Sequence, residues 1–147
     1  MKKNESHNNN WYARHYIGQA RDLMIKARQK ELKPYHITPQ QGVILAFLYN
    51  LGHKATLSEL SSHTGKGPNT ISPQMTALER DGLVNKERAV PKSTLLSFDL
   101  TDKGREICQY TMKVKSVDAI MSVLGEDECK ELISMLKMII KRAKKYN

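Results

Sequence analysis

Hydrophobic residues recur at helical spacing in several stretches of the chain, and capping residues bound these stretches. Residues 11–33 carry one apolar stripe, and Pro34 ends the predicted helix. Residues 37–53 contain no Asp, Glu, Lys or Arg. This second stretch predicts a buried central helix that is capped by Thr38 and ended by Gly52.

Two shorter predicted helices follow, with a tight turn between them. Thr56 and Glu59 have the capping-box spacing at the start of the first helix, and Gly65 can end it in the left-handed conformation. The second helix repeats apolar residues at Ile71, Met75 and Leu78. Because its other face is polar, the pair is typical of a helix-turn-helix that lays its second helix in a DNA groove.

The segment after this pair predicts a β-hairpin, and Asp81-Gly82 ends the preceding helix. Residues 84–89 and 95–100 flank a tip of residues 90–94, and residues 54–57 can add a short third strand. Thr101 caps one long predicted helix, whose apolar residues keep a period of about 3.5 as far as Gly125. A last helix runs from the acidic residues 126–128 to the basic residues 141–145, an order of charge that complements the helix dipole.

The predicted fold class is mainly α with a small β-sheet (α+β), as one structural domain overall. Residues 37–100 form a winged helix-turn-helix lobe, and residues 1–10 form a flexible N-terminus. The apolar faces of residues 11–36 and 101–147 exceed what so small a lobe can cover. We therefore expect these outer helices to form a dimerisation domain in a two-fold symmetric homodimer.

Composition fits one globular domain with a polyanionic partner. The chain has 147 residues, of which 39% are hydrophobic, and a net charge of +9. That charge favours nucleic acid as the partner, although it is not concentrated in the helix-turn-helix. No apolar run approaches the roughly 20 residues of a membrane span, and the polar start lacks a secretory core. We expect a cytoplasmic protein without membrane contact.

Catalytic and metal-binding patterns are weak. The sequence holds no glycine-rich phosphate loop, no nucleophile elbow and no His-Glu-x-x-His motif, and its five histidines are scattered. Cys108 and Cys129 lie in no metal-ligand spacing, so free thiols are the default expectation. We predict that the protein is not an enzyme and uses neither a metal nor a cofactor.

Several motifs together resemble the MarR family of winged-helix transcription regulators. They are Leu-Ser-Glu-Leu-Ser from residue 57, Asn-Thr-Ile-Ser from 69, Leu-Glu-Arg-Asp-Gly-Leu-Val from 78 and Asp-Leu-Thr-Asp-Lys-Gly from 99. They occur in the family's order, and the similarity covers nearly the whole chain. The resemblance implies a regulator that binds a pseudo-palindromic operator in double-stranded DNA and represses transcription.

The polar face of the second helix and the hairpin supply the candidate DNA contacts. These are Asn69, Thr70, Ser72, Pro73, Gln74, Thr76, Arg88 and Lys92. Gln74 and Asn69 have amides suited to adenine, whereas a hairpin cation suits phosphate or the minor groove. Many family members carry an arginine where this chain has Pro73. We expect the helix to begin near Asn69 or Thr70, so that this proline falls in its first turn.

The resemblance also implies a sensor, because many members of the family bind small aromatic ligands and others use a reactive cysteine. A small aromatic effector would contact an aromatic set comprising Trp11, Tyr12, His15, Tyr16 and Phe47. One alternative is thiol-based redox sensing through Cys108 or Cys129. Another is a nucleoid-type or protein-binding winged helix without effector control.

Overall fold

The computed structural model describes residues 2–92 and 94–146, with residues 2–7 described by their backbone alone. Met1 of the predicted N-terminal segment and Ser93 of the predicted hairpin tip lie outside this range.

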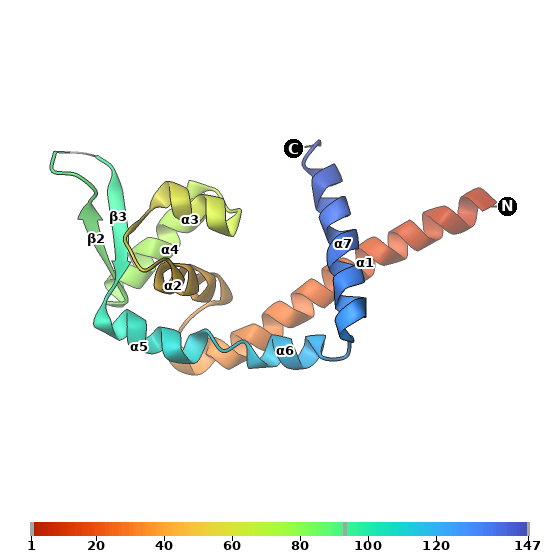
Figure 1. Cartoon of the computed structure of the whole chain (residues 1–147), viewed down its shortest axis with the longest axis horizontal. Helices are drawn as coiled ribbons and strands as arrows, with labels where there is room; N and C mark the ends of the chain where they lie inside the picture. The colour runs from red at the N-terminus through yellow and green to blue at the C-terminus, as the bar shows by residue number, and fades with distance from the viewer. Residues whose placement is uncertain (1, 93, 147) are drawn as a thin grey trace. The chain divides into compact units, whose positions relative to one another are not determined.

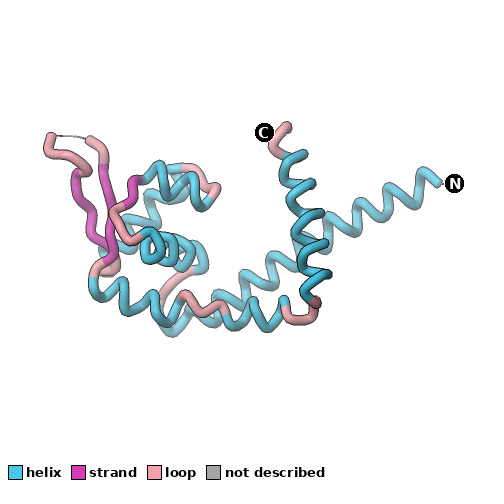
Figure 2. Tube along the Cα trace, in the orientation of Figure 1, coloured by secondary structure: helices cyan, strands magenta, loops and turns pink. Residues whose placement is uncertain are grey.

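The chain divides into two compact units between Val114 and Lys115, and each is described by itself. The first unit contains α1 (Lys2–Leu32), η1 (Lys33–Tyr35), α2 (Pro39–Leu51), β1 (Ala55–Thr56), α3 (Leu57–Thr64), α4 (Pro68–Arg80), β2 (Val84–Arg88), β3 (Leu96–Leu100) and α5 (Asp102–Thr111) (Figures 1 and 2). The second contains α6 (Lys115–Met121) and α7 (Glu126–Ala143).

The predicted caps fix the helix starts of the first unit. The Thr38 hydroxyl accepts a hydrogen bond from the Gln41 N–H at 3.2 Å, and the Gln41 side chain accepts one from the Thr38 N–H at 2.9 Å. The same reciprocal pair joins Thr56 and Glu59 at the start of α3. Each pair satisfies two backbone donors that a helix start leaves without partners.

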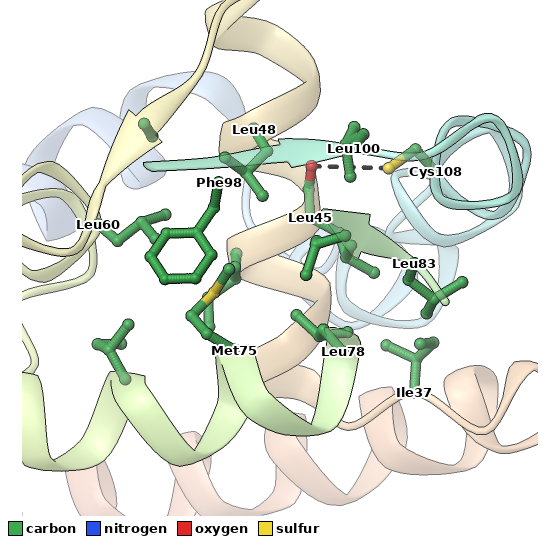
Figure 3. Close-up of a cluster of buried hydrophobic side chains, with 14 of the residues drawn as sticks. Ile37, Leu45, Leu48, Leu60, Met75, Leu78, Leu83, Phe98, Leu100 and Cys108 are labelled. Atoms are coloured by element: carbon green, nitrogen blue, oxygen red, sulfur yellow. Dashed lines mark hydrogen bonds between the residues drawn. The ribbon is translucent and has the colours of Figure 1, made fainter. Parts of the chain in front are cut away.

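A three-stranded antiparallel sheet and α2 enclose the core. The strand order is β1-β3-β2, and Phe98 of β3 pairs with Ala55 on one side and Lys86 on the other. Figure 3 shows Phe98, Met75 of α4 and Leu60 of α3 gathered in one cluster. The predicted central helix is confirmed, because α2 contacts α1, α3, α4, α5 and β3.

The end of α4, the start of β2 and the start of α5 meet at a tight junction. Thr101 caps α5 and also donates its hydroxyl to the Gly82 carbonyl at 2.7 Å, while its N–H donates to the Leu83 carbonyl at 3.1 Å. A Cβ atom on Gly104 would overlap the Leu83 carbonyl oxygen. Glycine at position 104 therefore lets the first turn of α5 pack directly on the backbone before β2.

Two predicted boundaries of the outer helices are wrong. Helix α1 begins at Lys2 and not near Trp11, since residues 2–10 contain no proline or glycine that would stop it. The long helix predicted from Thr101 to Leu124 is broken at residues 112–114 into α5 and α6. At the break, Arg28 of α1 donates hydrogen bonds to the carbonyl groups of Thr111 and Lys113.

The predicted fold class, α+β with a winged helix-turn-helix, is confirmed. Helices α3 and α4 form the helix-turn-helix, and β2 and β3 form the wing beside it (Figure 1). Among the helices of residues 2–92 and 94–146, none is long and apolar enough to cross a bilayer.

Candidate DNA-binding interface

Helix α4 begins earlier than the sequence analysis predicted. Gly67 is its N-cap residue and Pro68 occupies the first turn, where the missing N–H costs nothing. Pro73 therefore lies inside the helix and not in its first turn. Lacking an N–H, Pro73 cannot donate to the carbonyl of Asn69 one turn earlier. No side chain caps this helix start.

The faces of α4 divide sharply by exposure. Ile71, Met75 and Leu78 are buried against the core, as predicted. The opposite stripe is exposed and consists of Asn69, Pro73, Thr76 and Arg80. Thr70 and Ser72 are exposed beside this stripe, while Gln74 is only partly exposed next to the buried face. Asn69 is consequently better placed than Gln74 to reach a base edge.

Arg80 is the residue that the sequence analysis missed on this face. Its side chain is 75% exposed and pairs with Asp81 at 3.1 Å. Its place could have been found from spacing, since positions 69, 73, 76 and 80 follow the helical repeat. The motif that contains it, Leu-Glu-Arg-Asp-Gly, carries the family resemblance and the helix end, and neither of these marks Arg80 as a DNA contact.

The wing presents both cations and apolar side chains. Arg88 ends the strand ladder opposite Leu96, and Lys92 lies in the following loop with a left-handed φ of 67°. Both side chains are exposed, and neither forms an ion pair with another residue of the described chain. Val90 and Leu95 beside them are 58% and 51% exposed.

Ion pairs hold the wing to its neighbours. Lys86 of β2 pairs with Glu79 of α4 at 3.1 Å, and Lys54 before β1 pairs with Glu87 of β2. These two lysines thus already have a carboxylate partner on the protein itself. Arg88 and Lys92 remain the wing cations that are best placed for an external anion.

The predicted aromatic set falls into two groups. Trp11, Tyr12, His15 and Tyr16 contact one another along α1, with Trp11 stacked on His15 at a ring distance of 5.1 Å. Phe47 of α2 stacks instead on His63 of α3 at 4.0 Å. Within the described part of one subunit, ring contacts do not join Phe47 to the α1 group.

The two cysteines differ in environment. Cys108 is fully buried, and its thiol lies 3.6 Å from the Leu45 carbonyl oxygen (Figure 3). Burial raises the pKa of the Cys108 thiol to about 11, against a smaller opposing effect of Arg105. Cys129 is partly buried. Among the side chains that the structure describes, those of residues 8–92 and 94–146, no cluster of His, Cys, Asp or Glu could hold a metal ion.

An anchored helix with an exposed polar face, a preceding helix and a flanking two-stranded wing define a winged helix-turn-helix protein. Comparison with known proteins narrows this class. The HTH-type transcriptional regulator MgrA of Staphylococcus aureus is 30% identical over 114 residues, which cover 76% of this chain and 75% of MgrA. A scan against protein-family models finds no match.

Solved structures agree with this relationship. Reduced AbfR bound to DNA is 26% identical with a TM-score of 0.75, and the alignment covers 97% of this chain and 99% of AbfR. AbsC, a MarR family transcriptional regulator from Streptomyces coelicolor, is 25% identical with a TM-score of 0.82 and coverages of 91% and 93%. The chain belongs to the MarR family of transcriptional regulators. It is a regulator and not an enzyme.

The Cys108 environment predicts an unreactive thiol. With a pKa of about 11, only about 10⁻⁴ of the thiol is ionised at pH 7, and the thiolate is the reactive form. In a Cys129→Ser variant, alkylation of folded protein by iodoacetamide at pH 7.5 should be about a hundredfold slower than alkylation of the urea-unfolded chain. The rate should rise as the pH approaches 11. Equal rates in folded and unfolded protein would reopen redox sensing at Cys108.

Proposed function

We propose that this MarR-family protein is a homodimeric repressor that binds a pseudo-palindromic operator through α4 and the wing. The observation that carries the proposal is the two-sided character of α4. Ile71, Met75 and Leu78 fix the helix to the core, so its exposed polar stripe is held rigidly for the major groove. Residues 37–100 serve as the DNA-binding lobe in this proposal, and residues 11–36 and 101–147 as the dimerisation helices.

In this proposal the exposed polar stripe of α4 recognises the DNA bases. The Asn69 amide is exposed near the start of the helix and can form a bidentate pair with adenine, and Gln74 offers the same chemistry from a partly exposed site. Pro73 gives an apolar surface suited to a thymine methyl. Pro68 has no N–H and the Thr70 N–H donates to the Gly67 carbonyl at 2.9 Å, so the Asn69 N–H is the first-turn group that this proposal leaves to a phosphate.

In this proposal the wing binds the sugar-phosphate backbone of the DNA. Arg88 and Lys92 are exposed without ion-pair partners in the described structure, and flexible cations bind phosphate or the minor groove without reading sequence. Further hydroxyl groups on α4 come from Thr70, Ser72 and Thr76. The Thr76 hydroxyl also donates to the Ser72 carbonyl at 3.1 Å. In this arrangement α4 recognises the base sequence, whereas the wing binds DNA of any sequence.

Dimerisation is supported by the apolar surface of the outer helices. Helices α6 and α7 bury none of their residues within the subunit. Ile133, Ile139 and Ile140 of α7 are 50–54% exposed, and Tyr16 and Leu23 of α1 are 59% and 55% exposed. Apolar surface on this scale marks an interaction site, and a second copy is the simplest partner.

The dimer proposal predicts a two-subunit mass in light scattering at micromolar concentration, with an interface of roughly 2,000 Å² or more. Ile139→Asp should shift the protein toward monomer, since it places a charge in the apolar face of α7. Ser134→Asp changes the polar side of the same helix and serves as the control. A compact wild-type monomer would rule out the dimer.

We further propose that a small aromatic compound releases the protein from DNA by binding at the aromatic residues of α1. Trp11, Tyr12 and Tyr16 are 43–59% exposed and offer rings for stacking. By linkage, such a compound must bind the DNA-free form more tightly, by the same factor that it weakens DNA binding.

A screen of aromatic compounds should therefore find one that both raises the melting temperature and releases DNA. Tyr16→Ala should weaken both effects, whereas Tyr49→Ala, at an exposed tyrosine of α2, should leave them unchanged. Failure of a broad screen to give either effect would reject aromatic control. The alternative regulator without an effector would then be favoured.

The DNA-binding proposal predicts that substitutions at base-contacting and phosphate-contacting residues change the affinities for operator and random DNA differently. Asn69→Ala and Gln74→Ala should each cost about 1–3 kcal/mol on the selected operator and much less on random DNA. The loss at position 69 should be the larger because that side chain is more exposed. Lys92→Ala should weaken both kinds of DNA similarly and lower the salt slope by about 1 for each lost phosphate contact.

Protection assays on the same duplexes complete this test. The effects should appear in two half-sites spaced about one helical turn, or a multiple of it, apart. Identical profiles for Asn69→Ala and Lys92→Ala would contradict the division of roles. Steep salt dependence without any preferred sequence would favour the nucleoid-type alternative.

A further inference from the structure

The break between α5 and α6 has no cause in its own sequence. Residues 105–124 contain neither glycine nor proline, and their apolar residues continue one helical repeat across the break. Ile107, Val114, Val117 and Met121 keep that register. Sharp interruptions of helices have identifiable causes, of which one is a side chain inserted into the backbone hydrogen-bond ladder.

Arg28 of α1 is that side chain. Its Nη1 donates to the Lys113 carbonyl at 3.2 Å, and its Nη2 donates to the Thr111 carbonyl. In an uninterrupted helix these two carbonyls would accept from the N–H groups of residues 115 and 117. The guanidinium takes both positions at once, and a cation at the end of α5 also complements the helix dipole.

The surroundings hold Arg28 in place for this contact. Its side chain is only 12% exposed and forms an ion pair with Glu31 at 2.8 Å. Gly42 of α2 lies beside it, and a Cβ at position 42 would lie 4.0 Å from the Arg28 Nη2 and 3.3 Å from the Leu32 Cδ1. The lack of a side chain on Gly42 thus lets Leu32 pack closely on α2, and the Arg28 guanidinium lies at ordinary contact distance from the same position.

The broken form also carries an unsatisfied group. Thr111 is 2% exposed, and its hydroxyl has no hydrogen-bond partner among the described residues. A buried hydroxyl without a partner is unfavourable, and so is interrupting a stretch whose pattern suits one helix. Two charge-assisted hydrogen bonds from Arg28 oppose both costs.

We propose that Arg28 is a positioning residue that keeps α5 and α6 separate and thereby sets the half-site spacing that the dimer accepts on DNA. The link to spacing rests on the proposed function, since α5 begins at the DNA-binding lobe and the chain beyond the break carries the proposed dimer surface. When the guanidinium is released, the backbone N–H groups regain the carbonyls and α5 continues into α6.

The test compares full-length wild-type protein with Arg28→Met, Arg28→Met/Glu31→Gln and Arg21→Met. The double variant avoids leaving the half-buried Glu31 carboxylate without its arginine, in case the single variant folds poorly. Arg21 is the matched control on the same helix, because its side chain is 65% exposed and pairs only with the adjacent Asp22. The readout is the Cα chemical shifts of residues 112–114 without DNA.

We expect those three shifts to move to helical values in both Arg28 variants and to stay unchanged in Arg21→Met. In the wild type, the Arg28 Nη protons should exchange slowly with solvent. Unchanged shifts at residues 112–114, or fast exchange in the wild type, would overturn the role of Arg28 in the break. Neither measurement involves DNA, so both decide this point even if the proposed function fails.

The second arm measures spacing. A duplex selected by the wild-type protein from random sequences is varied by inserting or deleting base pairs between its half-sites. The Arg28 variants should bind the original duplex roughly tenfold more weakly, a typical size of coupling between sites, and should prefer a different spacing. An unchanged preference in variants with a continuous helix would refute the positioning role, and failure of the wild type to select any sequence would refute the proposed function.

Discussion

The contact of α5 with the backbone before β2 is the constraint on which the DNA-binding lobe depends. Gly82 ends α4 with a left-handed φ of 72°, and the carbonyls of Gly82 and Leu83 are both bound by Thr101. Gly104 then brings the first turn of α5 against the Leu83 carbonyl. One small region therefore fixes the end of α4, the start of β2, the end of β3 and the start of α5.

This junction explains why separate sequence motifs belong together. Asp-Gly-Leu-Val and Leu-Thr-Asp-Lys-Gly lie nearly twenty residues apart but contribute the two sides of the same contact. Lys103 adds a hydrogen bond from its ammonium group to the Asp81 carbonyl at 2.9 Å. Both motifs are recognisable in the sequence. Only the structure shows that residues of the second motif bind the backbone carbonyls of the first.

Local chemistry made much of the fold predictable. The caps at Thr38, Thr56 and Thr101 each depend on residues three positions away, and the stripe of α4 depends on one helical period. The site was less predictable, because exposure depends on where the helix begins and how it is packed. Pro68 moves the start of α4 back by about one residue, and packing then leaves Asn69 exposed while the flank of Gln74 is partly covered.

The break after α5 shows that the spacing of apolar residues alone does not predict where a helix is interrupted. Its residues favour one continuous helix, and an arginine more than eighty positions earlier in the chain interrupts it. An arginine within α1 is ordinarily expected to face solvent, yet the Arg28 side chain is only 12% exposed and its guanidinium binds carbonyls inside the fold. Under the proposed function, the geometry of DNA recognition then depends on a residue that lies away from α4 and the wing.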